Sequence, residues 1–221
     1  MIHMSAAIGY HYPQTRIGIM RIAAISKPDD TKALEEKKRQ LEGSLRQQYA
    51  DRELRRGLPA VGHYIRYYKQ FGKQYHVLMQ LDSLVDKGRN IPTREPLVEA
   101  MFMAELKNQL LTAGHDAKRL NGVLSVELSG GEEAYQLLSG KQQQLKAGDI
   151  LMRDESAVIG SILYGPDHRT RITATTRDCL FVVYAPYDIG ETAIQEHFAD
   201  IAAYVELFSP GAQVKEQKIC G

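Results

Sequence analysis

The sequence predicts an α+β fold, in which mainly antiparallel sheets carry helices packed on them. Two observations support this class. Between residues 32 and 111 apolar residues recur at helical spacing, whereas beyond residue 116 short apolar runs alternate with glycine-marked turns. Helices gathered in one part of a chain and strands in another are typical of α+β domains.

The N-terminal segment is expected to form a strand and a charged helix. The run RIGIMRIAAIS, residues 16–26, is rich in isoleucine and partly alternating, and Asp30 or Thr31 is placed to cap a helix after it. Residues 32–56 carry eight basic and five acidic side chains, with one narrow apolar stripe made by Leu34, Leu41 and Leu45. Two interpretations stay open: a solvated helix with intrahelical ion pairs, or a basic edge for RNA phosphates.

The middle of the chain should contain three further helices and then strands. Helices are expected at residues 60–71, 76–86 and 97–111, and a last amphipathic helix at 191–208. Strands are expected in NGVLSVELS, GDILMRD, SAVIGSILYG and RDCLFVVYAP. We divide the chain into an N-terminal segment (1–57), a main domain (58–210) and a mobile tail (211–221).

Composition excludes several classes of function. The net charge of +1 gives no global attraction to nucleic acid or membrane, so any basic site must be local. Cys179 and Cys220 lack the spacing of a zinc site or a disulfide framework, and no apolar run reaches the roughly 18 residues of a membrane span. We expect a reduced, cytoplasmic protein without metal or cofactor.

Common catalytic motifs are absent from the sequence. There is no GxxxxGK[ST] loop for nucleotide phosphates, no GxSxG nucleophile turn and no HExxH zinc helix. Among the seven scattered histidines, His115 in the triplet GHD is the most notable. We expect it at a glycine-marked helix exit, projecting into a cleft while Asp116 fixes the backbone.

The polar stretch GPDHRTRITATTR, residues 165–177, precedes an apolar strand. If it continues as a strand, alternation turns Arg171, Thr173 and Thr175 outward and Ile172 inward. Guanidinium groups and threonine hydroxyls suit phosphate or carboxylate oxygens. Threonine is also common on any exposed strand, so an oxyanion-binding face and an ordinary solvated face both remain open.

The order of these segments resembles a known family. From LPAVGHYIRYYKQFG through IPTREPLVEAMF, LLTAGHDAKRLNGVLSVELSGGEEAY, GDILMRDESAVIGSILYG and TRITATTRDCLFVVYAP, the chain is similar to the tRNA-binding and editing (B3/B4) domain of the phenylalanyl-tRNA synthetase β subunit. The resemblance covers residues 58–186 and is closest to the stand-alone versions. It implies an α+β fold whose cleft accepts a mischarged tyrosyl group on tRNA and hydrolyses the ester, without the synthetase catalytic domain.

Carried over position by position, the resemblance implies that most editing residues are replaced. The family motif LVDxTNY corresponds to LVEAMFM, so Glu99 stands for the aspartate, and Met101 and Phe102 for the threonine and asparagine. The family's motif histidine falls on Ala113, and its glutamate falls on Val182.

Two family positions are retained. Asp116 matches the motif aspartate and is assigned a structural role, and Gly160 in VIGS matches a pocket glycine. The remaining pocket is apolar, so it could hold an amino-acid-like ligand but lacks the polar partners for a tyrosine hydroxyl.

The leading hypothesis is a stand-alone domain that binds tRNA or aminoacyl-tRNA, with no assigned catalytic set. It requires residues 112–116 and 169–177 to meet at the mouth of one hollow. The proposed ligand or RNA contacts are His115, Gly160, Arg169, Thr170, Arg171, Thr173 and Arg177. The alternatives are a trans-acting aminoacyl-tRNA deacylase, with His115 and Thr112 near the ester, and a small-molecule-binding module on the same fold. The oligomeric state stays open.

Overall fold

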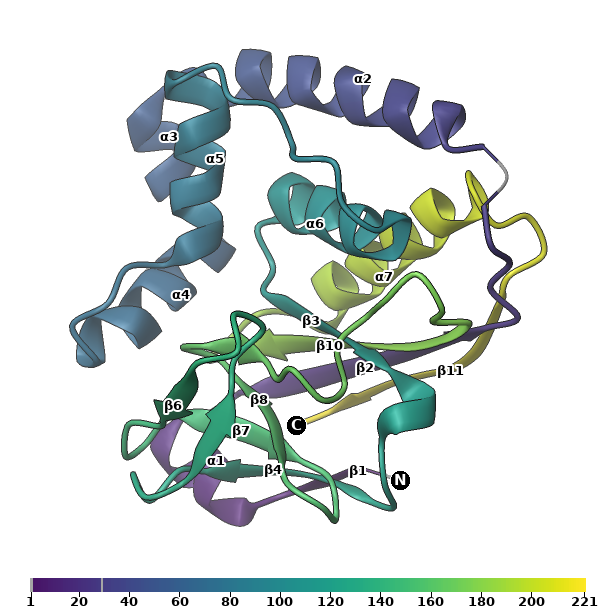
Figure 1. Ribbon diagram of the computed structural model, residues 1–221. Coiled ribbons are helices and arrows are strands. Elements are labelled where there is room, and N and C mark those ends of the chain that lie inside the picture. The colour runs from purple at the N-terminus through teal and green to yellow at the C-terminus, as the bar shows by residue number, and fades with distance from the viewer. Residues whose placement is uncertain (1, 29) are drawn as a thin grey trace.

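The computed structural model describes residues 2–28 and 30–221, which form two large sheets, a small two-stranded sheet and a layer of helices (Figure 1). The strands are β1 (Ile2–Met4), β2 (Arg16–Ala23), β3 (Thr112–Asp116), β4 (Leu124–Leu128), β5 (Ala134–Gln136), β6 (Gln142–Gln144), β7 (Ile150–Arg153), β8 (Val158–Ser161), β9 (Gly165–Pro166), β10 (Asp178–Ala185) and β11 (Gln213–Cys220). The helices are α1 (Ala6–His11), α2 (Lys32–Gln48), α3 (Arg52–Arg56), α4 (Pro59–Gln70), α5 (His76–Asp86), α6 (Pro96–Asn108), the short 3-10 helix η1 (Ala117–Arg119) and α7 (Glu191–Glu206).

The two large sheets are mainly antiparallel, which confirms the predicted α+β class. One sheet has the strand order β11-β2-β10-β3, and the other has the order β1-β4-β7-β8-β9. Among the described strand pairs only β1 with β4 is parallel. Figure 1 shows α6 and α7 on one face of the four-stranded sheet and the second sheet on its other face.

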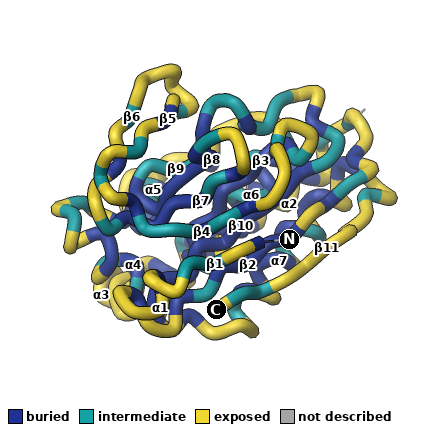
Figure 2. Tube along the Cα trace, turned by 90° about the horizontal axis from the view of Figure 1, so that it is seen from below, coloured by how far each residue is buried: buried dark blue, intermediate teal, exposed yellow. Residues whose placement is uncertain are grey.

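The predicted mobile tail is wrong, because residues 213–220 form β11 along the outer side of β2. Most of β11 is exposed, as the yellow tube in Figure 2 shows. Strands β2 and β11, from opposite ends of the chain, therefore share a sheet with β10 and β3 from the main segment. The division at residues 57 and 210 stays a prediction, although one hydrophobic core spans all three segments.

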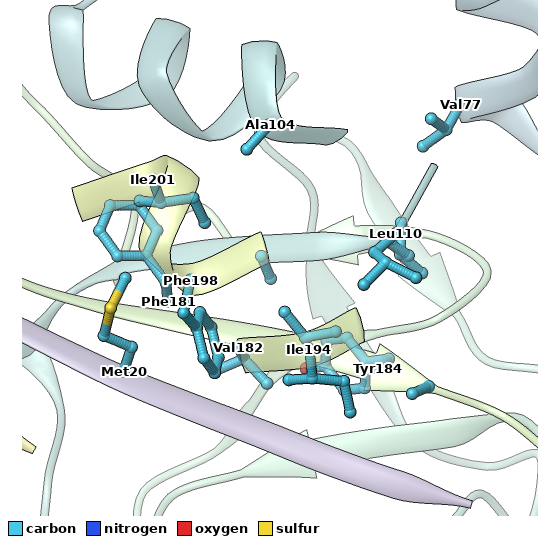
Figure 3. Packing of buried hydrophobic residues seen from close by; sticks show 14 of the residues in the cluster. Met20, Val77, Ala104, Leu110, Phe181, Val182, Tyr184, Ile194, Phe198 and Ile201 are labelled. Atoms are coloured by element: carbon cyan, nitrogen blue, oxygen red, sulfur yellow. The ribbon is translucent and has the colours of Figure 1, made fainter. Parts of the chain in front are cut away.

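Strand β2 packs closely on α7 at a glycine. Gly18 lies opposite Val183 in the sheet, and a Cβ at Gly18 would lie 2.6 Å from Ile194 Cγ2. Only glycine fits at this close approach between sheet and helix. The surrounding buried side chains, among them Phe181 and Phe198, fill the contact (Figure 3).

Two helix boundaries differ from the sequence prediction. The charged segment 32–56 is two helices, because Asp51 caps α3 by accepting a hydrogen bond from the Glu53 backbone N–H at 2.8 Å. Helix α6 ends at Asn108 rather than at 111. The next residue, Gln109, adopts a left-handed conformation (φ 52°), and its side-chain amide donates to the carbonyl oxygens of the last turn.

Most of the basic side chains of α2 form ion pairs with nearby carboxylates. Lys38 is fully buried, and its Nζ lies 2.6 Å from Glu99 Oε2 and 2.5 Å from Glu35 Oε1. Arg39 bonds Glu42 within the same helix. Glu99, which the resemblance placed at a family aspartate, thus fixes α2 to α6. The ion-pair interpretation of this helix fits the structure, with pairs between helices added to those within it.

We predict that Lys38→Ala lowers the free energy of unfolding by about 3–5 kcal/mol, because it leaves the Glu99 carboxylate buried and unpaired. Urea unfolding followed by circular dichroism measures this change. The matched control is Lys37→Ala, whose side chain is exposed. A loss of under about 1 kcal/mol for Lys38→Ala, the range of an exposed pair, would contradict a buried role for the pair.

Candidate functional site

The segment 167–177 covers the open edge of strand β3. β3 ends the sheet order β11-β2-β10-β3, so one side of its backbone has no neighbouring strand. The Asp116 N–H donates to the Thr170 carbonyl oxygen at 2.7 Å, and His115 forms an isolated bridge with Arg171. The two segments singled out in the sequence are therefore brought together, and the second satisfies an open sheet edge.

Side-chain hydrogen bonds hold this segment in place. The Thr176 hydroxyl donates to Asp116 Oδ2 at 3.0 Å, and Asp116 Oδ1 accepts from the Lys118 N–H at 3.1 Å. On the other side, the Thr170 hydroxyl donates to Asp167. Thr170 and Thr176 are both buried. The expected regular strand, with Thr173 and Thr175 pointing outward, is not formed. Residues 173–176 make a turn instead, in which the Thr176 N–H donates to the Thr173 carbonyl oxygen at 2.9 Å.

Side chains fill the space between the two segments, so the described residues do not frame the expected hollow there. A Cβ at Gly114 would lie 2.5 Å from Ile172 Cδ1 and 3.2 Å from Met101 Sδ. Ile172 therefore packs inward over β3, as its place in the sequence pattern predicted. None of the five cavities that we describe is lined by residues of both segments.

His115 does not project into a cleft, and that prediction is wrong. Because α6 ends at Asn108, the triplet GHD lies inside β3, and His115 has no exposed surface. Thr112 and Gly114 face α7 and α6, so alternation turns His115 to the opposite face of the sheet.

The hydrogen bonds of His115 define its protonation. The Thr170 hydroxyl gives its proton to Asp167, so its oxygen can only accept from His115 Nδ1, 2.7 Å away. Burial, assisted by the charge of Arg169, lowers the pKa of His115 to about 4. The ring is therefore neutral with its proton on Nδ1, and Nε2 has no partner among the described residues. This arrangement is that of an enclosed structural histidine.

Thr112 and His115 lie on opposite faces of β3 and do not form one site. The Thr112 hydroxyl lies 2.7 Å from His197 Nε2, and its backbone N–H donates to Glu105 Oε1 at 2.8 Å. Burial raises the pKa of Glu105 to about 8 and lowers the pKa of His197 to about 3. This buried polar group joins α6, β3 and α7.

The segment and the neighbouring η1 together carry four arginines, which we call the arginine rim: Arg119, Arg169, Arg171 and Arg177. The side chains of Arg119 and Arg169 are 46% and 38% exposed, and each donates to the backbone carbonyl of the other. Arg169 also binds the buried Asp154 at 2.8 Å. Burial alone would raise the pKa of Asp154, but hydrogen bonds from Arg169 and backbone amides outweigh it and lower the pKa.

Arg171 and Arg177 retain uncompensated charge. Arg171 donates to the His168 carbonyl oxygen at 2.7 Å, and Arg177 donates to the Ala174 carbonyl oxygen at 2.9 Å. Across residues 2–28 and 30–221, neither has a carboxylate within 4.0 Å. The sequence analysis missed Arg119, although its position three residues after Asp116 could have indicated it.

The positions carried over from the family form an apolar pair. Ala113 and Val182 lie directly opposite each other in the β3–β10 ladder, and both are buried. Gly160 lies close to β9, where a Cβ would be 3.1 Å from the Gly165 carbonyl oxygen, so it permits close strand packing. No group of three metal-ligating side chains gathers anywhere in the described chain. None of the helices described has the length and apolarity to cross a membrane.

We predict that Glu105 contributes a loss of stability as the pH rises from about 4.5 to about 8, on top of the opposite contribution of the buried histidines, whose pKa values are lowered. The folded protein holds this carboxyl proton more tightly than the unfolded chain does, so the Glu105 contribution is complete below pH 4.5 and is lost as the pH rises through 8. Glu105→Gln stays neutral and keeps the acceptor for Thr112, so it should remove this part of the slope. Urea unfolding at several pH values measures the effect.

The exposed Glu36→Gln serves as the control and should leave the profile unchanged. Burial also raises the pKa of Asp149, to about 7. Its effect on stability is the same in every variant, so it cancels when the pH profile of a variant is compared with that of the unaltered protein. Parallel profiles for Glu105→Gln and the unaltered protein would show that Glu105 is ionised or accessible in the folded state.

Comparison with known proteins agrees with this architecture. No curated protein matches the chain in sequence. Among solved structures, it is similar to an N-terminal fragment of the phenylalanyl-tRNA synthetase β-subunit from Pyrococcus horikoshii, with a TM-score of 0.51 and 9% identity; the alignment covers 100% of this chain and 54% of that one. The chain thus spans about half of that structure, and at this identity the similarity shows the fold alone. The family model of the B3/4 domain matches residues 64–205, well over half of the sequence, and the chain belongs to the B3/4 domain family.

Proposed function

We propose that the protein is a cytoplasmic tRNA-binding or aminoacyl-tRNA-binding domain that contacts RNA phosphates through the arginine rim and does not hydrolyse the ester. The observation that carries this proposal is the uncompensated charge of Arg171 and Arg177 on a segment fixed to the sheet edge. Membership of the B3/4 family supports it, because the matching fold occurs in a fragment of a tRNA synthetase subunit.

The chemistry of the rim suits phosphate oxygens. Guanidinium groups offer paired N–H donors in a planar fork, and the Thr173 and Thr175 hydroxyls, 3.0 Å apart, lie in the same turn. Because the net charge of the whole chain is only +1, phosphate binding has to come from such a local group. His115, Thr170 and Gly160 are buried, so we no longer assign them as contacts: His115 and Thr170 support the segment, and Gly160 permits the packing of β8 on β9.

Hydrolysis and capture of an amino-acid-like group are both poorly supported by this geometry. Ester cleavage needs a held water, oxyanion donors and an accessible base. His115 is enclosed, Thr112 lies on the other face, and Ala113 with Val182 offers no polar group. Ile172 and Met101 occupy the space beside Gly114.

We predict that tRNA binding weakens with rising salt and that Arg171→Ala/Arg177→Ala reduces the slope of log K against log[salt] by about 1.4–1.8. Each lost phosphate contact removes roughly 0.7–0.9 from that slope. Filter binding across a salt series measures it. The control Lys37→Ala/Lys87→Ala removes the same charge from exposed positions elsewhere. Equal slopes for the two double variants would contradict a specific role for the rim.

A second experiment separates binding from editing. We expect no release of amino acid above the blank when the protein is incubated with a panel of mischarged tRNAs, because no accessible base faces the bound ester. Release that disappears in His115→Ala, with the fold intact by circular dichroism, would establish the deacylase alternative instead.

A further inference from the structure

A second basic site lies at the other end of the helical layer. α3, α4 and α5, on the left of Figure 1, enclose a hollow of about 280 Å³. Four cationic side chains line it: Arg52 and Arg56 from α3, Lys69 from α4, and Lys73 from the turn after α4. We call this the basic hollow. Its volume is close to the lower end of the roughly 300–1,000 Å³ of small-ligand sites.

The cations that line the basic hollow outnumber its acids, although Lys73 is also engaged by Tyr164, with its Nζ 4.7 Å from the centre of that ring. Across the described residues, none of the four cations has a carboxylate within 4.0 Å. The acid that lines the hollow, Asp82, is already bound by Arg55 at 2.8 Å. This contrasts with α2, where Lys38 and Arg39 are paired.

The repeated cations also oppose helix stability. Arg52 and Arg56 are four residues apart on α3, so they lie on one face and repel each other. The helix is held in place by the residue between them. Arg55 is fully buried, binds Asp82 and Asp86 of α5, and donates to the Tyr49 carbonyl oxygen at 2.6 Å. Because Arg55 anchors α3 to α5, the helix can hold Arg52 and Arg56 side by side despite their repulsion.

An apolar wall stands beside the cations. Ile65 and Leu78 line the hollow, and Met79, also part of its lining, is 49% exposed. An exposed apolar side chain next to four cations fits a ligand with an anionic group joined to a planar apolar group. Methionine packs well against aromatic rings because its thioether is polarisable and its side chain is flexible.

We propose that the basic hollow binds a nucleotide, with the phosphate on Arg52, Arg56 and Lys69 and the base against Met79 and Leu78. The nucleotide can be free or part of an RNA strand, since the phosphate and base are the same in both. The site does not depend on the arginine rim. Arg52 and Arg56 also precede residue 64, where the family match begins, so half of its cations lie outside the matched domain.

The test is isothermal titration with adenosine 5′-monophosphate, adenosine, inorganic phosphate and a short single-stranded oligoadenylate at low salt. We expect the monophosphate to bind more tightly than adenosine or phosphate, and Arg52→Ala/Arg56→Ala to weaken it by about tenfold or more, because charge-assisted hydrogen bonds are lost. Met79→Glu should weaken it as well. Measured in Arg171→Ala/Arg177→Ala, oligoadenylate binding tighter than the monophosphate identifies RNA as the ligand of the basic hollow, and equal or weaker binding identifies the free nucleotide.

The control variants test whether nucleotide binding in the basic hollow is independent of the arginine rim. Arg52 and Arg56 are exposed, and unchanged thermal unfolding would show that their replacement leaves the fold intact. Arg171→Ala/Arg177→Ala should bind the monophosphate as the unaltered protein does. Three results would overturn the proposal: no binding of either nucleotide probe at millimolar concentration, affinity unchanged in Arg52→Ala/Arg56→Ala, or equal competition by a polyglutamate peptide, which would indicate a general anion site.

Discussion

The open edge of β3 is the constraint on which the candidate site depends. An edge strand has backbone groups without a neighbouring strand, and here the chain itself covers them through Thr170, Arg171 and Thr176. This closure buries His115 and fixes Asp116. The contacts that complete the sheet edge therefore fill the space between residues 112–116 and 167–177 with packed side chains.

Pairing with carboxylates distinguishes the cations that stabilise the fold from those that remain free to bind a ligand. Lys38 and Arg55 are buried with carboxylates and join α2 and α3 to α5 and α6. Such cations are costly to unpair and are unavailable to RNA. Arg171 and Arg177 of the arginine rim and the cations of the basic hollow have no such carboxylate partner among the described residues. A nearly neutral chain can thus carry two local groups of unpaired cations.

Local sequence patterns predicted the strongly periodic helices and strands. They failed for element boundaries and side-chain burial that depend on contacts with residues distant in sequence. The isoleucine-rich run predicted the start of β2 at Arg16, although the strand ends at Ala23 rather than at Ser26, and the spacing of apolar residues predicted both ends of α5. The early end of α6 depends on the left-handed Gln109, and that shift of three residues moved His115 from a helix exit into a strand. The exposed, charged β11 lacks an alternating apolar pattern. The burial of Thr170 depends on its partners His115 and Asp167, of which the first is distant in sequence.

The most direct test of the closed β3 edge is the protonation state of His115, followed by ¹⁵N NMR of the imidazole ring between pH 4 and 8. The closure predicts a neutral ring with its proton on Nδ1 that does not titrate until the pH approaches about 4. A ring that titrates near its ordinary value of about 6.5, or one that carries its proton on Nε2, would show that the segment 167–177 leaves the edge open and that His115 is accessible.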